Sequence, residues 1–427
     1  MKTDILIVGS GCSGLYCALQ LPQDMQITVI TKSDVESSDS FLAQGGICVL
    51  KDESDYTSYF EDTMRAGHYE NDRTSVDIML RSSMQIIHDL VSYGVDFHRE
   101  ENGEFSYTRE GAHSEKRILF HEDITGKEIT RKLLSQVQKS SNIKLMEHTL
   151  LLDIVCQDNA CYGAVIKKED GTAEVVEAAI TVFATGGIGG LYERSTNFRH
   201  LTGDAVAIAM KHGVVLKNIN YVQIHPTTLY SEEKEERSFL ISESVRGEGA
   251  KLYDKHMRRF VNELLPRDQL TAAITDQMKK DHSKFVWEDL REIPEKELHS
   301  HFPNIVAYCA LKGYDVTKEC IPVVPAQHYF MGGIWVDYNS HTSMGRLYAV
   351  GETACNGVHG KNRLASNSLL ESLVFARRAA QQIVTEFKLT KGEARSACTV
   401  DLKRYADEKK ILKEYRSLVL KEIEREQ

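Results

Sequence analysis

A glycine-rich turn near the N-terminus is the first segment whose residue types and spacing can do chemistry. Gly9, Ser10, Gly11, Cys12, Ser13 and Gly14 follow a short apolar run and precede a helical pattern. The first glycine permits a tight turn, the second lets the backbone approach a pyrophosphate, and the third lets helix and strand pack closely. The helix N-terminus that follows favours an anion. The turn therefore predicts a dinucleotide site.

Three other segments bear on which dinucleotide is bound. The predicted second strand ends near Lys32 and Asp34, so the residue that contacts the ribose stays ambiguous. A glycine turn at 184–187 and a strand at 347–350 that runs into Gly-Glu both return to the same region. Two distant returns fit the extended FAD better than NAD. Glu352 would suit a ribityl hydroxyl, and its alternative role is that of an acid at a helix start.

The elements that must position this turn alternate along residues 1–215. Strands are expected at 4–8 and 26–31, separated by a helix at 13–21. Apolar residues recur at three to four positions over 75–93, and 125–139 also has a helical pattern. The alternation predicts an α/β fold with a parallel sheet covered by helices on both sides.

The rest of the chain has a different character. An antiparallel patch is expected from strands at 143–156, 163–168 and 174–178, with Asp170 and Gly171 forming a hairpin turn. An apolar strand follows at 179–183. A mixed unit rich in proline follows, then a strand at 347–350 and a long helix at 366–387. The charged, amphipathic tail at 399–427 predicts either a short helical appendage or an interaction surface.

Composition excludes several classes of protein. The 427 residues are 42% hydrophobic and 27% charged, which rules out a disordered chain, a collagen-like fibre or a disulfide mini-protein. The net charge of −10 disfavours binding to nucleic acid. The nine cysteines form no CxxC pair, so a zinc ribbon or ferredoxin-type cluster has no ligand set and no metal is expected. Their odd number, with no signal or membrane segment, predicts reduced thiols in the cytoplasm.

Eleven motifs between residue 4 and about residue 380 make the chain resemble the succinate dehydrogenase/fumarate reductase flavoprotein family. They are GSGCSG, SFLAQGGI, TREGAHS, FATGG, TGDAVAIA, YVQIHPTTLY, FLISESVRGEGA, LPRD, IPVVPAQHYFMGGIWVD, GETACNGVHG and NRLASNSLLES. The resemblance implies a Rossmann-like FAD-binding domain at 1–218 and 330–390. It also implies an inserted α+β capping (substrate) domain at 219–329 and a short helical C-terminal tail at 391–427. Many relatives carry a larger C-terminal helical domain.

The same resemblance implies which residues hold FAD. Besides the turn at 9–14, the expected contacts are Lys32, Asp39, Ser40, Phe41, Leu42, Ala43, Gln44, Gly45, Gly46, Asp204, Glu352, Ser368 and Leu369. Membrane-linked members bond a histidine of the 39–46 loop covalently to the flavin. Asp39 occupies that position here, so FAD is expected to be non-covalent and succinate oxidation is disfavoured.

The resemblance also gathers a set of substrate residues around one pocket, which spacing alone does not show. They are His225, Ser242, Glu243, Arg267, His328 and Arg363. An arginine fork matches the two oxygens of a carboxylate, so these residues suit a four-carbon dicarboxylate. Each has a simpler alternative: core histidines, a helix-start ion pair of Arg267 with Asp268, a surface position for Arg363, or a Glu243 that only orients Arg246.

Glu110 discriminates between substrates within this family. In the members that oxidise L-aspartate, the corresponding glutamate is thought to meet the substrate ammonium, which succinate lacks. Its alternative role is that of a turn acid paired with Arg109 or Arg117. The resemblance then implies FAD-dependent oxidation of L-aspartate to iminoaspartate, with O2 or fumarate as electron acceptor. In the fumarate direction Arg267 would deliver a proton. Iminoaspartate feeds quinolinate formation at the entry to NAD (pyridine nucleotide) biosynthesis, so hand-over to quinolinate synthase is expected.

Three other functions compete with this interpretation. A soluble fumarate reductase flavoprotein would use the same pocket in reverse. An FAD subunit of a membrane electron-transfer complex would need an iron–sulfur partner, and Asp39 argues against it. An NAD-dependent dehydrogenase would lack the yellow colour of a flavin.

Overall fold

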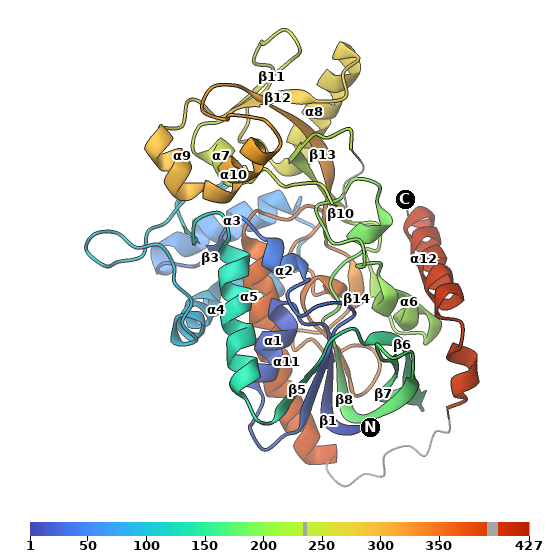
Figure 1. Ribbon diagram of the computed structural model, residues 1–427. Helices are drawn as coiled ribbons and strands as arrows, with labels where there is room; N and C mark the ends of the chain where they lie inside the picture. The colour runs from blue at the N-terminus through green and yellow to red at the C-terminus, as the bar shows by residue number, and fades with distance from the viewer. Residues whose placement is uncertain (234–236, 391–399, 427) are drawn as a thin grey trace.

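A seven-stranded mixed sheet forms the centre of the chain (Figure 1). In this computed structural model, residues 1–233, 237–390 and 400–426 are described. The strand order is β5-β2-β1-β8-β7-β6, and β15 also pairs with β8. The strands are β1 (Lys2–Val8), β2 (Ile27–Ile30), β5 (Ile143–Met146), β6 (Leu150–Gln157), β7 (Ala160–Lys167), β8 (Ala173–Phe183) and β15 (Leu347–Ala349). The pairs of β1 with β2 and β8, of β2 with β5 and of β15 with β8 are parallel, as the β/α alternation predicts.

Two hydrophobic cores lie on the two faces of this sheet, because side chains alternate along each strand. Ile5 and Ile7 of β1 join the first core, whereas Leu6 and Val8 join the second. The helices α1 (Cys12–Gln20), α4 (Arg73–Ser92), α5 (Thr125–Lys139) and α11 (Asn367–Thr390) contribute to the first core. The helices α6 (Asp204–Lys211) and α12 (Glu408–Arg425) cover the other face (Figure 1).

The antiparallel part of the sheet differs from the prediction at two places. The expected strand 143–156 is two strands, because the chain turns at His148, whose φ is 46°; β5 pairs in parallel with β2, and β6 pairs antiparallel with β7. The strands expected at 174–178 and 179–183 form the single strand β8. The predicted turn at Asp170–Gly171 is confirmed between β7 and β8.

A second, antiparallel sheet carries a third hydrophobic core. Its order is β10-β13-β12-β11, and buried residues from Leu229 to Val323 form the core. The elements are β10 (Val222–Leu229), α7 (Glu243–Gly247), β11 (Lys251–Tyr253), α8 (Arg267–Asp281), β12 (Val286–Asp289), α9 (Glu295–His301), α10 (Pro303–Leu311) and β13 (Ile321–Phe330). This separate core supports the predicted capping domain, whose boundaries at 219 and 329 stay a prediction.

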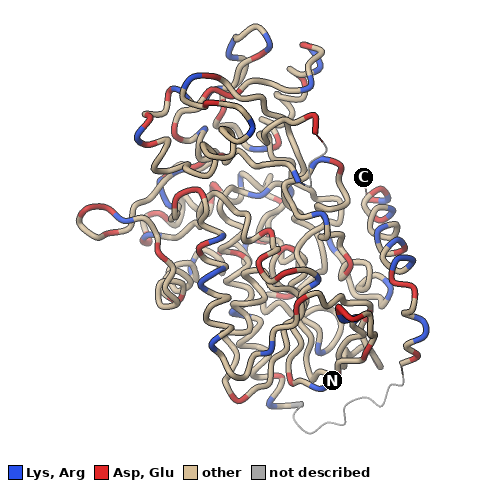
Figure 2. Tube along the Cα trace, in the orientation of Figure 1, with Lys and Arg blue, Asp and Glu red and all other residues tan. Residues whose placement is uncertain are grey.

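The C-terminal helix is part of the second core. Tyr415, Val419 and Ile423 of α12 are buried there, and the Tyr415 hydroxyl donates to the carbonyl of Leu152 at 2.6 Å. Lys and Arg recur on the outer side of the same helix (Figure 2). The described part of the expected tail, residues 400–426, is mostly helical, and α12 packs onto α6 rather than standing apart as an appendage. Residues 391–399 and 427 lie outside the described residues.

Short elements complete the described chain. They are α2 (Asp39–Leu42), β3 (Ile47–Cys48), η1 (Glu53–Asp55), α3 (Tyr56–Ala66), β4 (Ile118–Leu119), η2 (Gly189–Leu191), β9 (Leu216–Lys217), β14 (Gly333–Trp335), η3 (Gly351–Thr353), β16 (Ala354–Cys355) and η4 (Leu402–Tyr405). Among the described helices, none combines the length and apolar character needed to cross a bilayer.

Candidate active site

One long cavity runs from the N-terminal glycine turn to the third core. It encloses about 1660 Å³, counting its opening to solvent. Its walls come from the carboxyl ends of β1, β2 and β8, the 37–46 segment, the start of α11 and the β10–β13 sheet. Ligands of open α/β sheets bind at the carboxyl ends of the strands, so the cavity lies where a dinucleotide is expected.

The glycine turn has the geometry that a pyrophosphate site needs. Gly9 has a φ of 119°, and a Cβ there would lie 2.0 Å from the carbonyl oxygen of Ala184. A Cβ on Gly14 would lie 2.2 Å from the carbonyl oxygen of Gly9. Gly11 is different: the first atom that its Cβ would meet is Ser40 Oγ, at 3.2 Å. Gly9 and Gly14 therefore serve the packing of strand and helix, while Gly11 lets a ligand approach the backbone.

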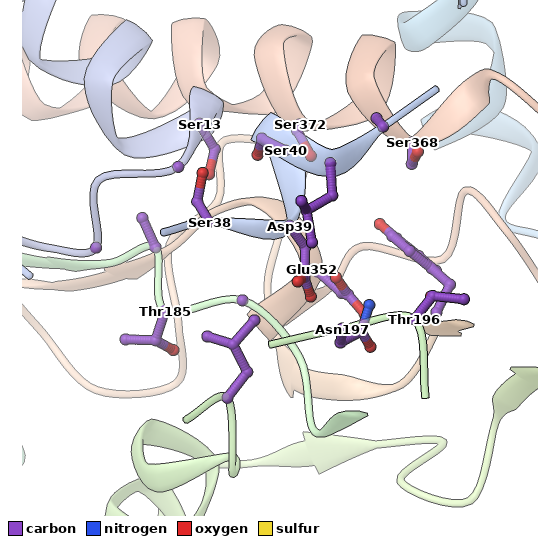
Figure 3. A pocket seen from close by; sticks show the side chains of 18 of the residues that line it. Ser13, Ser38, Asp39, Ser40, Thr185, Thr196, Asn197, Glu352, Ser368 and Ser372 are labelled. Carbon is purple, nitrogen blue, oxygen red and sulfur yellow. The ribbon is translucent and has the colours of Figure 1, made fainter. Parts of the chain in front are cut away.

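Two carboxylates point toward one another in the middle of the cavity (Figure 3). The amide of Phe198 donates to Asp39 Oδ1 at 3.0 Å, and the amide of Phe330 donates to Glu352 Oε1 at 2.8 Å. Loss of water raises the pKa of Asp39 to about 7. The same desolvation, with the charge of Asp39, raises the pKa of Glu352 well above its usual range. A protonated carboxyl beside an ionised one offers both a donor and an acceptor to ligand hydroxyls.

Lys32 reaches across the cavity to the start of α6. Its Nζ lies 2.6 Å from Asp204 Oδ2 and 2.9 Å from the carbonyl oxygen of His200. Lys32 and Asp204, predicted as separate cofactor contacts 172 residues apart, therefore form one ion pair on the cavity wall.

Several polar atoms on the cavity wall lack a hydrogen-bond partner among the described residues although they are shielded from water. They are Ser38 Oγ, Asp39 Oδ2, Gln44 Oε1, Asn197 Oδ1, His225 Nε2 and Arg363 Nε. Buried polar atoms are normally hydrogen-bonded, so this set calls for a polar ligand with many donors and acceptors. These groups fit FAD. The glycine turn suits its phosphates, the paired carboxylates suit its hydroxyls, and a side-chain amide suits the polar edge of its ring.

Most residues predicted to hold the cofactor line this cavity. They are Gly9, Ser10, Gly11, Ser13, Lys32, Asp39, Ser40, Leu42, Ala43, Gln44, Gly45, Gly46, Asp204, Glu352, Ser368 and Leu369. Three others, Cys12, Gly14 and Phe41, do not line it. Cys12 is buried in the first core, Gly14 packs against Gly9, and the Phe41 ring lies beneath the cations of Lys127 and Arg131 on α5.

The end of the cavity nearest the third core gathers the predicted substrate residues. His225 and His328 meet with ring centroids 5.1 Å apart, and burial lowers the pKa of both imidazoles well below the usual range. The amide of Thr227 lies 3.2 Å from His225 Nδ1. Nδ1 also lies 3.0 Å from the carbonyl oxygen of Thr227, so these contacts fit either tautomer, and Nε2 has no hydrogen-bond partner among the described residues. Both histidines act as neutral hydrogen-bonding groups there.

Arg363 is a buried cation on the same wall. Its Nη1 donates to Ser368 Oγ at 3.0 Å, and its guanidinium lies 4.4 Å from the ring centroid of Tyr329. Burial, followed by the charge of Arg267, lowers the pKa of Arg363 to about 10. Two buried guanidiniums that repel each other favour an anion between them, because its charge relieves both desolvation and repulsion.

Arg267 is the first residue of α8 and pairs with Glu243. Its Nε donates to Glu243 Oε2 at 2.6 Å, and its Nη1 donates to Gln223 Oε1 at 2.9 Å. Burial opposes ionisation of Glu243, but the charges of Arg267 and Arg246 outweigh it and lower the pKa. The Glu243 carboxylate therefore orients Arg267 while leaving part of its guanidinium on the cavity wall.

Glu110 also lines the cavity, within electrostatic reach of Arg267. Its oxygens accept hydrogen bonds from Ser244 Oγ at 2.7 Å and Ser366 Oγ at 2.5 Å. Burial, followed by the charge of Glu243, raises the pKa of Glu110. Gly45 lies directly beside it: a Cβ there would lie 2.7 Å from Glu110 Oε1, so the carboxylate would have to shift. The site thus has one carboxylate that a cationic group would stabilise in its ionised form.

Three of the simpler alternatives fit the structure less well: those for Arg267, for Arg363 and for the pairing of Glu110 with Arg117. Arg267 pairs with Glu243, whereas the carboxylate of Asp268 contacts His68 at 2.8 Å. Arg363 is 4% exposed, which excludes a surface position. Glu110 hydrogen-bonds serines rather than Arg117, whose guanidinium is held by Asp55 and Asp62.

Sequence reasoning missed other residues on the cavity wall. Thr196 and Asn197 line it from the loop after η2, and Arg237 lines it from the third core. Thr196 Oγ1 lies 2.7 Å from His328 Nδ1, and Asn197 Nδ2 donates to the carbonyl of His328 at 3.1 Å. These residues lie between the recognised motifs, so no spacing signal pointed to them. Ser366 lies inside the NRLASNSLLES motif, so the sequence could have predicted it as a site residue.

The sheet, the glycine turn and the cavity define an FAD-binding oxidoreductase fold. The chain belongs to the family described as FAD binding domain, whose model matches residues 4–369. The resemblance to succinate dehydrogenase/fumarate reductase flavoproteins is confirmed, and the cofactor of this chain is FAD.

Relatives and solved structures agree with this family. The chain is 49% identical over 380 residues to "L-aspartate oxidase" of Clostridium perfringens, covering 89% of this chain and 86% of the relative. It is 47% identical to "L-aspartate oxidase" of Clostridium acetobutylicum, covering 90% and 88%. The FrdA chain of E. coli quinol fumarate reductase aligns with a TM-score of 0.86 at 30% identity, covering 99% of this chain and 74% of that one.

Proposed function

We propose that this chain is an FAD-dependent oxidoreductase that oxidises L-aspartate to iminoaspartate, with O2 or fumarate as electron acceptor. The observation that carries the proposal is the charge pattern of the cavity: Arg363 and Arg267 lie on a wall that also holds the Glu110 carboxylate. This pattern matches a molecule with two carboxylates and one ammonium. The names of the relatives favour aspartate oxidation over the alternative of a soluble fumarate reductase.

The chain's own residues bind and orient such a substrate. Arg363 and Arg267 each offer a fork of donors to a carboxylate, and Nε2 of the neutral His225 ring adds a further hydrogen-bonding atom. His328 and Ser242 line the same end of the cavity. Fixing both carboxylates leaves the Cα–H bond one orientation, and such positioning lowers a barrier by several kcal/mol.

In this scheme Glu110 distinguishes an amino dicarboxylate from a dicarboxylate without an amine. In the buried site the carboxylate attracts the substrate ammonium, and a dicarboxylate without an amine leaves it unpaired. Bound FAD supplies the acceptor for the two electrons that leave Cα. The substrate nitrogen loses a proton as the imine forms, so aspartate gives up two electrons and two protons.

We also propose roles beyond the reaction itself. The product imine hydrolyses in water, so a following enzyme must take it up rapidly; quinolinate synthase, at the entry to NAD biosynthesis, is the expected recipient.

The eight described cysteines are all thiols, which agrees with a cytoplasmic location. In the part of the chain that the structure describes, no cluster of three or more His, Cys, Asp or Glu is arranged to bind a metal ion.

Anaerobic mixing tests the proposal. The purified yellow protein is mixed with L-aspartate in the absence of O2, and the flavin absorbance near 450 nm is followed. We expect rapid bleaching that fumarate reverses, whereas succinate leaves the colour unchanged. Bleaching by succinate without bleaching by L-aspartate would contradict the proposal and favour the reductase.

A further inference from the structure

A cysteine, a histidine and an aspartate form a constellation outside the cavity. Cys156 lies near the end of β6, and its Sγ is 3.1 Å from Nδ1 of His212, the residue that ends α6. His212 Nε2 is 2.7 Å from Asp153 Oδ1 on the same strand β6. The strand and helix that carry them lie at the edge of the main sheet (Figure 1).

This order of groups favours a thiolate. A histidine hydrogen-bonded to a cysteine accepts the thiol proton, and a carboxylate on its other nitrogen orients the ring and stabilises the imidazolium. Burial works to raise the pKa of Asp153, but the hydrogen bond from His212 and the charge of Lys211 outweigh it and lower the pKa. Asp153 is therefore an anion, as the constellation needs. Cys156 is partly exposed, so its side chain is not sealed within the second core.

A second cysteine lies directly across the hairpin. Cys156 of β6 is the register partner of Cys161 of β7. The turn between the strands is Asp158–Asn159, with φ values of 49° and 56°, and Gln157 pairs with Ala160 to close it. In a two-residue hairpin the pair after the closing pair is not hydrogen-bonded, and its Cα atoms lie about 4.5 Å apart. That separation falls within the range that a disulfide spans.

The two thiols differ in the way that a redox pair requires. Cys161 is fully buried, and burial, with added repulsion from Cys156, raises its pKa to about 11. One thiol is thus partly exposed and paired with histidine, while its neighbour stays protonated in the second core.

We propose that Cys156 is a peroxide-reactive thiol activated by His212, and that Cys161 converts its oxidised form into a disulfide. In the first step the Cys156 thiolate attacks one oxygen of hydrogen peroxide. An S–O bond forms, the O–O bond breaks, and the leaving hydroxide takes the imidazolium proton and departs as water. Cysteine is oxidised by two electrons to a sulfenic acid, and peroxide is reduced.

In the second step the Cys161 sulfur attacks the sulfenic sulfur. An S–S bond forms, the S–O bond breaks, and the hydroxyl leaves as water with the Cys161 proton. In a protein whose other thiols are reduced, this disulfide is a reversible modification, because thiol reductants convert it back to two thiols. The inference goes beyond the proposed function and does not depend on it, although flavin reoxidation by O2 would generate the same peroxide.

The test compares two cysteines within one molecule. The reduced FAD-loaded protein is treated with a small excess of hydrogen peroxide, quenched with iodoacetamide at intervals, and analysed by peptide mass spectrometry. Cys320 is the internal control, since it is also partly exposed, but burial and the charge of Asp289 raise the pKa of its thiol. We expect a Cys156–Cys161 disulfide to form about tenfold faster than Cys320 is oxidised, or faster still.

Two variants separate the parts of the proposal. His212→Asn should slow oxidation of Cys156 about tenfold, because the thiol loses its base. Cys161→Ser should replace the disulfide by a Cys156 sulfenic acid that dimedone traps. The proposal is overturned if Cys156 of the unmodified protein reacts no faster than Cys320, a result that needs no variant to fold. It is also overturned if His212→Asn leaves the rate unchanged, or if oxidised Cys156 accumulates without a link to Cys161.

Discussion

Oppositely charged side chains lie close together in the cavity, but not every carboxylate there is paired with a cation. Glu243 is satisfied by Arg267, whereas Glu110 is held only by the hydroxyls of Ser244 and Ser366. A carboxylate with hydroxyl partners remains able to accept from a cation, because each oxygen has two lone pairs. Substrate selectivity should therefore depend on Glu110 more than on Glu243.

Glu110→Gln tests this selectivity. The amide keeps the shape and the serine contacts, but it has no charge for an ammonium. We expect kcat/KM for L-aspartate to fall at least about tenfold, equivalent to about 1.4 kcal/mol, with a much smaller change in fumarate reduction by a reduced viologen. Glu115→Gln, at an exposed position five residues along, is the matched control. Equal losses with both substrates would mean that Glu110 only supports the fold.

Glu288 is a buried carboxyl of the third core, and its ionisation can be tested by measuring how protein stability changes with pH. It is fully buried on β12, and its nearest cation is Arg246, with Nη1 3.9 Å from Oε1. Burial raises its pKa to about 7, against the partial effect of Arg246. Because the folded pKa exceeds the unfolded value of 4.5, the folded state binds more protons between these values, and stability falls as pH rises through them.

Glu288→Gln should remove this pH dependence. Relative to the unmodified protein, the variant should gain stability as pH rises from about 5 to about 8, by an amount on the order of 3 kcal/mol. Thermal unfolding at several pH values measures the difference, with the exposed neighbour Glu292→Gln as control. Parallel melting curves for variant and parent across this range would show that Glu288 ionises normally.

At the scale of elements, local periodicity was a good guide where one face is buried. The helix predicted at 125–139 is α5 with the same bounds, since its apolar residues recur at helical spacing. The prediction of one strand at 143–156 was wrong, because hydrophobic periodicity does not show where a strand is interrupted. The turn at His148 depends on a backbone conformation that no residue pattern there indicates. Likewise, the amphipathic tail predicted a helix but not its partner, because packing onto α6 is a long-range contact.

The buried face of α12 can be tested by two neighbouring residues. Val419 is fully buried against α6 and the second core, whereas Leu420 is 40% exposed. Val419→Asp places a charge among apolar side chains and should destabilise the protein by about 3 kcal/mol or more, whereas Leu420→Asp should change stability by less than about 0.5 kcal/mol. Thermal melting of both variants measures the contrast. Equal effects would mean that α12 does not contribute to the core.

At the scale of the whole molecule, the site depends on how distant segments meet. The residues on the substrate end of the cavity come from positions 110 to 363. His225 and His328 lie on the β10–β13 sheet, and the others lie on helices or in connecting segments. Residue types and motifs identified them singly, but spacing carries no information about which of them share a wall. The family resemblance provided that grouping, and the structure adds Thr196, Asn197 and Arg237, which lie in loops without a recognisable pattern.

The third core is tied to the rest of the molecule by a buried aspartate. Asp123, 1% exposed, accepts hydrogen bonds from the amide of Asn304 at 3.2 Å, its side chain at 2.7 Å, and the amide of Ile305 at 2.8 Å. These groups lie in the first turn of α10, whose amides have no partner within the helix. The carboxylate therefore caps a helix of the third core from the segment that precedes α5.

Asp123→Ala should loosen this connection without emptying the FAD site. Loss of the cap costs about 1–2 kcal/mol, so the third core should close over the cavity less often and KM for L-aspartate should rise about five- to thirtyfold. Bound FAD per chain should stay unchanged, and limited proteolysis should cut near α10 sooner. Asp315→Ala is the matched control, since Asp315 caps Thr317 within the third core alone. If KM is unchanged, or if FAD is lost in parallel with substrate affinity, Asp123 does not govern the seating of the third core.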